Sequence, residues 1–572
     1  MTDTKRTLVA GLLIGVLTLF IPFYLNLIGI LPGQEEEPLP SDSMPFVDRE
    51  TSGYLQTEKA PDAPALALIP SSPSSSAHQD LEFVLVTEKY QAIVSSRGGG
   101  SIKSFKLLSS QKDGYKYLGG YDDFGEYDAL SNVELVLPFV DNCSPCLSIN
   151  NAHLITEAFN VVSPSLFDGQ IINLYGSDSL VVVTALVENN QTIRKVTTFF
   201  ADKYIINHDF SLESPSSLGV SVLWNDGIRA TEKNLAEELT YSEGYAAQAK
   251  DIQSISLSPS SLNDLAERKT FLNKTDWVAI RNKYFINSLI ASDAVGGELS
   301  AKSFEISGGS YVPAYSMGLL FNSPTIHIKQ FFGPLDVDAI ASSKTYLDRV
   351  MNFGWLPLQP FSRSVLWILK KLHLVGLNYG LILIFFAFLI RFITGPLTKK
   401  SYKSTQKMQT IQPELKKIQE KYKNDSARLN REMMGLYKKH GVNPLGGCIP
   451  MLIQMPLLFA LFIVFRSTIE FRGAPFFGWI SNLSQPDTII NLPFYIPIYG
   501  DQVAFLPIVL GISMFFSQKL SMATMDKSQK PMMYMMSVFF FLLFNSFPSG
   551  LNLYYTVYNI LNYYQQKSIK GK

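Results

Sequence analysis

The chain has 572 residues, enough for about two to four domains, and 47% of them are hydrophobic while only 17% are charged. Lys and Arg together number 49, as do Asp and Glu, so the net charge identifies no partner and only the distribution of charge is informative. The three cysteines are too few for a disulfide-rich scaffold or a four-ligand zinc site.

A long apolar segment, residues 8–31, follows Lys5 and Arg6 at the start of the chain. At 1.5 Å per residue it exceeds the roughly 30 Å hydrocarbon core of a bilayer. A cleaved signal peptide is the alternative, but its apolar core is usually about 7–15 residues and ends in small residues. We therefore expect residues 1–31 to form a signal-anchor span with its N-terminus in the cytoplasm.

Two regions without membrane spans follow. Residues 32–79 are rich in Pro, Ser and Glu and hold too little apolar surface for a core, so we expect a disordered linker. Residues 80–345 contain short alternating runs, such as FVLVTEKYQAIVSS and SLVVVTALV, separated by clusters of Gly, Asn, Asp and Ser. This pattern predicts one large all-β sandwich domain, which lies outside the cytoplasm if the anchor has the predicted orientation.

The last part of the chain, residues 346–572, holds the other candidate spans. The sequence FPSG at 547–550 is a turn signal that divides the longest apolar stretch into two helices. With the anchor this predicts a polytopic α-helical membrane protein of six spans, the last five being 374–396, 449–468, 503–518, 532–547 and 550–565.

Basic residues indicate which side of the membrane each loop faces. Residues 396–448 carry twelve Lys and Arg against four acids, whereas residues 470–502 carry one Arg against three acids. Lysines recur in the next loop and in the C-terminal tail. Because basic loops stay in the cytoplasm, both termini are predicted to be cytoplasmic and the β domain extracytoplasmic.

The segment before the second span, residues 361–373, is amphipathic. Phe361, Val365, Leu366, Leu369 and Leu372 share one side, and Arg363, Lys370 and Lys371 lie off it. We favour a helix in the outer membrane interface over the alternative, which is the beginning of one long bent span.

The basic loop 397–447 has helical periodicity in two parts, 408–422 and 429–440, separated by KYKNDSA with Ser426 as the expected cap. This predicts a cytoplasmic hairpin of two helices. Its basic residues follow the positive-inside rule, and they also suit contact with phospholipid headgroups or ribosomal RNA. The lysines that we assign to this surface are Lys399, Lys403, Lys407, Lys416 and Lys417.

Arg391 is a permanent charge inside the second predicted span, in LILIFFAFLIRFITGPLTKK. An Arg deep in the membrane costs roughly 2.5–3.5 kcal/mol, and none of the five C-terminal spans contains an acid to pair with it. A side chain that extends to the nearby cytoplasmic interface is the alternative. Since several lysines beyond Thr398 already anchor that end, we favour a functional charge.

Uncharged polar residues and methionines accompany Arg391 in the spans. Gln454 lies in the third span, and Asn552, Thr556 and Asn559 share one face of the last. Such groups hold helices together or, collectively with Arg391, line a hydrated cavity. The flexible side chains of Met455, Met514, Met532 and Met536 suit a surface that guides varied apolar segments, although Met is also common core filler.

Cysteine and histidine give weaker signals. Cys143 and Cys146 form a CxxC, for which a local disulfide outside the cytoplasm is more plausible than a redox site, because no strand-to-helix context surrounds it. The histidines of residues 80–345 have no metal-ligand spacing, and no catalytic motif stands out. We therefore predict no cofactor, no metal and no enzymatic activity.

Four motifs carry a resemblance to a known family. YKKHGVNPLGGCIPMLIQMP from Tyr437 onward, FRGAPFFGWISNLSQPD, FPSGLNLYY and IRFITGPLTKKSY closely resemble the YidC/Oxa membrane protein insertases, and the resemblance covers residues 350–565. The anchor and the β domain are similar to the Gram-negative form of that family, whose periplasmic domain is a β-supersandwich. The resemblance implies an inner-membrane location.

The resemblance also implies a mechanism. The family core encloses a hydrophilic groove, open to the cytoplasm and to lipid, in which Arg391 and Gln454 match the family's groove residues. The groove receives polar parts of a substrate while the apolar helix partitions into lipid, which supplies the driving force without ATP. The implied partners are nascent membrane proteins, the Sec translocon with its accessory subunits, ribosomes or signal-recognition targeting factors, and anionic phospholipids, but not DNA.

Two other functions remain as competing hypotheses. A sugar-modifying or sugar-binding envelope enzyme requires acids and histidines that converge in the β domain. A transporter requires a through-pore and coupled flux, and the lack of intramembrane acids argues against a proton pump.

Overall fold

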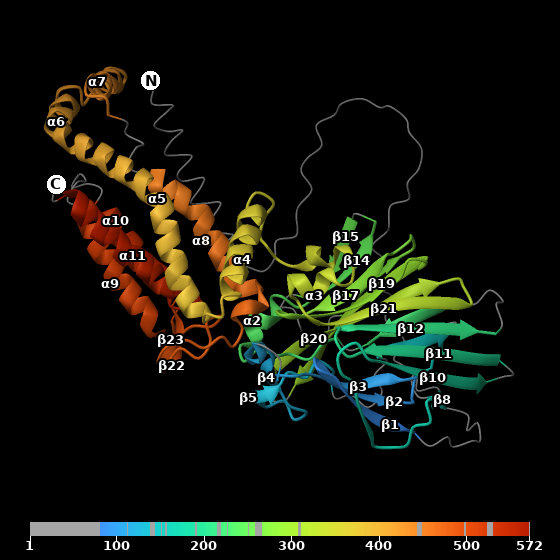
Figure 1. The fold of residues 1–572 in the computed structure, drawn as a ribbon. Coiled ribbons are helices and arrows are strands. Elements are labelled where there is room, and N and C mark those ends of the chain that lie inside the picture. Colours follow the sequence, from blue (N-terminus) through green and yellow to red (C-terminus); the bar gives the residue numbers. More distant parts are fainter. Residues whose placement is uncertain are drawn as a thin grey trace, which may run out of the picture.

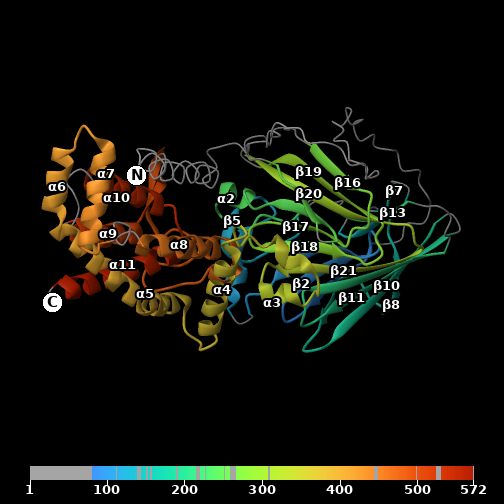
Figure 2. The same cartoon turned by 90° about the horizontal axis from the view of Figure 1, so that it is seen from above.

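The computed structural model describes residues 80–570 with short gaps at 111–112, 138–143, 150–151, 155–156, 189–190, 214–218, 226, 250, 258–265, 307–309, 443–448, 497–498 and 523–529. The predicted anchor (1–31) and linker (32–79) lie outside the described residues. The described chain has a β-rich half and a helical half, and α2 and α4 lie where the two halves meet (Figures 1 and 2).

The largest sheet of the β-rich half has nine strands in the order β15-β14-β17-β18-β21-β12-β11-β10-β8, and its neighbours are antiparallel. Its strands are β8 (Asn160–Ser163), β10 (Ser179–Glu188), β11 (Gln191–Phe200), β12 (Ile205–Leu212), β14 (Glu243–Gln248), β15 (Asp251–Ile255), β17 (Trp277–Arg281), β18 (Phe285–Ile290) and β21 (Thr325–Pro334).

Smaller sheets accompany it. A six-stranded sheet has the order β16-β19-β20-β13-β6-β7, a four-stranded sheet the order β3-β2-β1-β9, and β4 pairs with β5. These strands are β1 (Glu82–Val86), β2 (Tyr90–Ser95), β3 (Ser101–Leu107), β4 (Leu118–Tyr121), β5 (Tyr127–Asn132), β6 (Cys146–Ile149), β7 (Ala152–His153), β9 (Gln170–Asn173), β13 (Val220–Trp224), β16 (Ala266–Phe271), β19 (Gly296–Ile306) and β20 (Ser310–Phe321). The short helices are η1 (Gly114–Tyr117), α2 (Leu235–Leu239), α3 (Val337–Ala341) and η3 (Tyr346–Val350).

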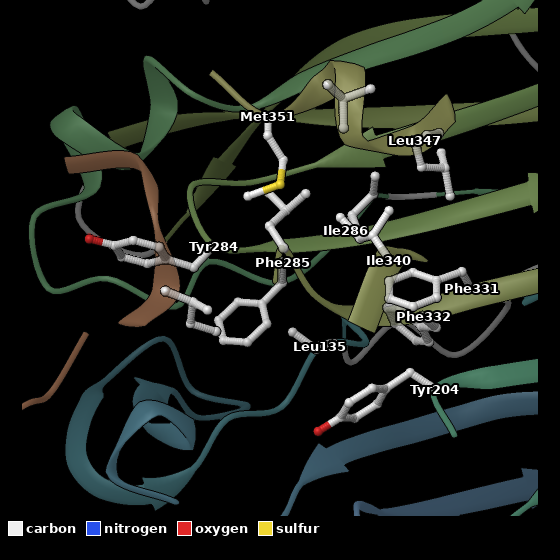
Figure 3. Packing of buried hydrophobic residues seen from close by; sticks show 14 of the residues in the cluster. Leu135, Tyr204, Tyr284, Phe285, Ile286, Phe331, Phe332, Ile340, Leu347 and Met351 are labelled. Carbon is white, nitrogen blue, oxygen red and sulfur yellow. The ribbon is translucent and has the colours of Figure 1, made fainter. Parts of the chain in front are cut away.

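The core of the β-rich half lies against both faces of β18. Successive strand residues point to opposite faces, yet Phe285 and Ile286 are both fully buried. Figure 3 shows Ile286 near Ile340 and Leu347, which come from α3 and η3. These two short helices therefore cover one face of the sheet, and the expected β-rich domain is present.

The helical half contains α4 (Gln359–His373), α5 (Tyr379–Thr410), α6 (Gln412–Lys421), α7 (Ser426–Lys439), α8 (Ile449–Ser467), η4 (Ile469–Phe471), α9 (Phe505–Met522), α10 (Lys530–Phe544) and α11 (Ser549–Lys570), with a ribbon of β22 (Thr488–Ile496) and β23 (Gly500–Ala504). Among the described residues one helical stretch, Tyr379–Met408, is long and apolar enough to cross a membrane by length and composition. The stretches Gln454–Ser467 and Phe505–Lys519 are apolar but shorter. The six-span topology stays a prediction.

Several element boundaries differ from the expected ones. The second span was predicted to end at residue 396, but α5 continues through Pro396 to Thr410, because a proline removes one helical hydrogen bond without preventing the helix from continuing. The cap of α7 is Asp425 rather than Ser426, since its carboxylate accepts a hydrogen bond from Arg428 N at 2.9 Å. The β22–β23 ribbon was not predicted; it accommodates Pro493 because the pairing of the two strands is interrupted between Asn491 and Ile496.

The apolar periodicity of the basic loop corresponds to a small separate core. Ile411, Leu415, Leu436 and Val442 are buried together where α6 and α7 pack on each other. The α6–α7 pair lies at the end of α5 that is remote from the β-rich half (Figure 1). Helix α4 also has the expected amphipathic pattern, with Val365, Leu366 and Leu369 buried.

Candidate functional site

Arg391 lies on α5, where that helix packs against α11, and is only 8% exposed. Its Nη1 donates to the hydroxyl of Tyr558 at 3.4 Å, and its Nη2 donates to Oε1 of Gln565. The guanidinium also lies over the Tyr558 ring, 5.5 Å from the ring centroid. Its Nε has no hydrogen-bond partner among the described residues. The charge is thus buried against neutral groups only.

The neutral side chains around Arg391 come from one face of α11. Tyr554, Tyr558 and Gln565 are spaced four and seven residues apart, so they share a side of the helix. Gln565 reaches across to α5, where its Nε2 donates to the carbonyl of Gly395 at 3.3 Å. A side chain at position 395 would crowd this amide, since a Cβ there would lie 3.1 Å from Nε2. Gly395 therefore allows Gln565 to lie beside Arg391.

Unpartnered polar atoms gather nearer the start of α11. Among the described residues, Asn552 Oδ1, the hydroxyls of Tyr554 and Tyr555, and Thr556 Oγ1 are buried without a hydrogen-bond partner. Buried polar atoms normally find partners in protein or water. They form a concentration of unused hydrogen-bonding capacity on α11, inside the helical half.

The structure brings only part of the expected groove set together. Asn552 is fully buried, and its Nδ2 donates to the carbonyls of Phe544 and Phe547 at 3.1 and 3.2 Å. By helix geometry, Asn552, Thr556 and Asn559 lie about 150° around α11 from the side that faces Arg391. Gln454 is half-buried on α8, and no recorded contact within the described chain joins it to Arg391. A shared groove therefore stays a prediction.

Tyr558 and Gln565 were missed by sequence reasoning. Their signal was the common helical side of residues 554, 558 and 565, together with the position of Gln565 near the basic end of α11, which matches the depth of Arg391 before Lys399. The predicted span ended at residue 565, whereas α11 runs to Lys570. Gln565 was thus predicted to be the last residue of the span, whereas it lies inside α11.

The structure describes the predicted lysine surface and two of the four predicted methionines. Met455 is half-buried on α8, and Met514 on α9 packs against the main hydrophobic core. Met532 and Met536 belong to α10, but their side chains lie outside the described residues. The five assigned lysines, Lys399, Lys403, Lys407, Lys416 and Lys417, are all exposed on α5 and α6.

The cysteines and histidines of the β-rich half have other partners. Cys146 is disulfide-bonded. The other two cysteines of the chain, Cys143 and Cys448, lie outside the described residues, so the pairing of Cys143 with Cys146 stays a prediction. His208 bonds Gln330 Oε1 through Nε2 at 2.9 Å, and His327 contacts Asp209. Within the described residues no cluster of His, Cys, Asp and Glu is arranged to hold a metal ion.

Another buried arginine, Arg472, joins the two halves and was not predicted. Its Nε donates to Glu232 at 2.6 Å, and its two terminal nitrogens donate to the carbonyls of Lys116, Leu118, Gly119 and Thr231. The sequence signal was that it is the single Arg of the acidic loop 470–502. Figures 1 and 2 show the chain after α8 meeting the β-rich half near α2.

Two carboxylates of the β-rich half, Glu237 and Glu238, have shifted pKa values at this junction. Burial would raise the pKa of Glu237, but Lys283 and Arg466 outweigh it and hold the pKa at about 2. Arg466 reaches Glu237 from α8 at 2.9 Å, and Lys283 reaches it at 3.0 Å. Burial and the neighbouring charge of Glu232 raise the pKa of Glu238 to about 7. The junction therefore depends on charges contributed by both halves.

Comparisons with known proteins cover both halves. Residues 370–572 match the family model described as 60Kd inner membrane protein, and residues 168–368 match the YidC periplasmic domain. The protein named "Membrane protein insertase YidC" from Chlorobaculum parvum is 37% identical over 408 residues, 69% of each chain. The protein of the same name from Prosthecochloris aestuarii is 34% identical over 552 residues, 92% of this chain and 89% of the relative.

A solved structure titled "Active YidC insertase crystal structure with the first transmembrane domain resolved" aligns with 85% of this chain and 92% of its own, at 16% identity and a TM-score of 0.33. The two family models and the two relatives decide the assignment. The chain belongs to the YidC family of membrane protein insertases.

Proposed function

We propose that this chain inserts and helps to fold nascent proteins of the inner membrane, by itself or beside the Sec translocon. The names of its relatives support the insertase activity. In this proposal the helical half spans the membrane, both termini are cytoplasmic, and the β domain is periplasmic. Insertion is a partition of apolar helices into lipid, so no catalytic residue and no cofactor is required.

One observation carries the proposed mechanism: Arg391 is buried where α5 packs against α11, with neutral partners only. A cation in this setting attracts and solvates the acidic or polar tail of a substrate while that tail crosses the membrane. Its unpartnered Nε provides a hydrogen-bond donor for that guest. Gln454 and the 552–559 side of α11 keep the path hydrated in this hypothesis.

The polar atoms near residue 555 support the same mechanism. A path that must accept many different substrates needs donors and acceptors that the protein itself leaves unused. Asn552 Oδ1, Tyr555 Oη and Thr556 Oγ1 are such atoms among the described residues. Water or a passing backbone would supply their missing partners. Met455 and Met514 border the apolar side, where their flexible side chains adapt to the substrate.

We assign the α6–α7 hairpin to the cytoplasmic reception of substrates. Its small apolar core holds the two helices together, and its lysines are exposed. Such a surface suits ribosomal RNA, signal-recognition targeting factors or anionic phospholipid headgroups. Replacing Lys416 and Lys417 by Gln would test this role by the co-sedimentation of the chain with ribosomes.

The test of the mechanism is depletion of the native insertase and complementation with variants. Arg391→Ala combined with Gln454→Ala is expected to slow insertion of a small coat-like substrate with an acidic periplasmic tail by tenfold or more, about 1.4 kcal/mol of lost stabilisation. Lys400→Ala is the matched control, because Lys400 is an exposed cation on the same helix. Normal insertion of every acidic substrate by the double variant would refute the mechanism.

A further inference from the structure

A polar cavity of about 290 Å³ lies where the β domain meets the segment that leads into α4. Its walls come from the region of β14, from the end of β17, and from residues 349–354 and Gln359. The cavity is separate from the surroundings of Arg391. Its volume lies at the lower end of the range of ligand sites, so it suits a small polar group rather than a whole lipid or a peptide.

Two guanidinium groups contribute to the cavity wall. Arg281 is only 3% exposed; its Nε donates to the carbonyl of Asn282 at 3.1 Å and its Nη1 donates to the carbonyl of Val350. Among the described residues no hydrogen bond is assigned to its Nη2. Arg349 is exposed at the cavity mouth, with its guanidinium 4.7 Å from the Tyr346 ring centroid. Paired guanidiniums are typical of phosphate recognition.

One carboxylate balances part of this charge. Glu243 lines the same cavity and accepts a hydrogen bond from the hydroxyl of Tyr245. The Tyr241 ring lies 5.9 Å from the Arg281 guanidinium. The wall therefore offers two cations and one anion beside aromatic rings. This arrangement complements a group that carries a phosphate and an amine together.

Exposed apolar side chains lie beside the cavity. Trp355 and Leu356 directly follow the wall residue Gly354 and are 59% and 81% exposed, and Phe361 is 55% exposed on the first turn of α4. Tryptophan at such a position is characteristic of the membrane–water interface. The carbonyl of Asn352, another wall residue, accepts a hydrogen bond from Ser467 Oγ at the end of α8 at 2.8 Å. The cavity is thus held at the level of that helix end.

We propose that this cavity binds the headgroup of a zwitterionic phospholipid of the outer leaflet, with the phosphate toward Arg281 and Arg349 and the ammonium toward Glu243. The acyl chains remain outside, against Trp355, Leu356 and Phe361. The proposal rests on the orientation given under Proposed function, which places the outer end of α8 at the periplasmic membrane surface. A monosaccharide has a similar size but needs neither paired guanidiniums nor an apolar rim.

The experiment uses the full chain in detergent micelles and dihexanoyl phosphatidylethanolamine as the probe, with binding followed by native mass spectrometry. Arg349→Gln is expected to weaken binding about fivefold to tenfold, the size of one charge-assisted contact to phosphate. Glu243→Gln should abolish the preference for this lipid over dihexanoyl phosphatidylglycerol. Arg363→Gln is the matched control, because Arg363 is a nearby arginine outside the cavity wall that pairs with Asp348 at 3.1 Å.

Equal binding by Arg349→Gln and the native chain, or no binding to the native chain, would overturn the proposal. Displacement of the lipid by inorganic phosphate at an equal concentration would show a free-anion site, and displacement by galactose would show a saccharide site; both also overturn it. Insertion by Arg349→Gln is measured in parallel. If the insertase mechanism is wrong, Arg391 variants insert substrates normally while the native chain still binds the lipid. Failure of the lipid proposal and failure of the insertase mechanism are therefore distinguishable.

Discussion

Two arginines of this chain are almost equally buried, Arg472 at 2% and Arg391 at 8% exposure, but their surroundings differ in one respect. Arg472 has an acceptor for each of its five N–H groups, namely Glu232 and four main-chain carbonyls. Arg391 donates to the Tyr558 hydroxyl and to the Gln565 amide oxygen, and its Nε has no partner among the described residues.

This difference in hydrogen bonding distinguishes Arg472, whose charge holds the structure together, from Arg391, whose charge can still bind a substrate. Saturated donors at Arg472 fix the loop after α8 in the β domain, and any additional acceptor would have to displace one already present. Unsaturated donors at Arg391 leave a buried cation whose desolvation is only partly offset. The same residue type thus holds two halves together at one site and remains ready for a guest at the other.

Removing the saturated arginine should have the largest effect. Arg472→Met removes the cation that hydrogen-bonds Glu232 and leaves this carboxylate buried beside Glu238, so we expect a loss of about 3–5 kcal/mol in the free energy of unfolding. Limited proteolysis of the purified chain should then cut between the two halves. Arg268→Met, which removes an exposed partner of Glu298, should cost less than about 0.5 kcal/mol. Equal stability of the two variants would contradict a structural role for Arg472.

Another buried cation, Lys195, sharpens the comparison because a lysine can lose its proton. It is fully buried in the β domain, where its Nζ donates to the carbonyls of Gly100 and Pro145 at 3.3 and 3.0 Å. Burial lowers its pKa from 10.5 to about 7. Between pH 7 and 10 this lysine therefore binds more protons in the unfolded chain than in the folded one, and its contribution to stability rises with pH by about 3 kcal/mol.

Lys195→Met should remove the contribution of Lys195, so the stability of the variant should rise less between pH 7 and 10 than that of the native chain. The measurement is the midpoint of thermal unfolding in buffers of matched ionic strength. Lys269→Met is the control, since Lys269 lies on the surface and should keep the rise. A variant at position 195 that retains the native pH profile would exclude Lys195 as its source.

Hydrophobic periodicity was sufficient to predict some of these features. The spacing of Ile411, Leu415 and Leu436 anticipated the small core of the α6–α7 hairpin. The absence of acids from the predicted spans anticipated that Arg391 lies among neutral groups. These features depend on neighbours along one helix and on composition, which can be read from a sequence directly.

Partners that are distant in the chain were not predictable in the same way. Gln565 contacts Arg391 across 174 positions of sequence, and a neutral amide carries no charge signal that would indicate the pair. Arg472 is satisfied mainly by backbone carbonyls, which every residue possesses, so residue types do not reveal them. The cavity at Arg281 arises where residues 349–354 pass the ends of β14 and β17, which is a property of the fold alone.

The smallest expected effect comes from giving Arg391 an acidic partner, as Arg472 has in Glu232. Gln565→Glu places a carboxylate where an amide oxygen now accepts from Arg391, and it gives the cation an ion-pair partner. We expect the folded state to gain about 1 kcal/mol, because an ion pair replaces a hydrogen bond from the guanidinium to a neutral amide oxygen in a buried site. Insertion of substrates with acidic tails should slow several-fold, because the attraction of Arg391 for the tail is neutralised. Substrates with uncharged tails should be inserted normally.

The matched control for this variant is Gln566→Glu, which adds the same acid one residue further along α11, where the side chain contacts Asn562 rather than Arg391. It should not distinguish acidic from uncharged tails. Thermal unfolding and insertion of the two substrate classes are measured for both variants. A Gln565→Glu chain that is more stable and still inserts acidic tails at the native rate would show that the charge of Arg391 serves packing, as that of Arg472 does.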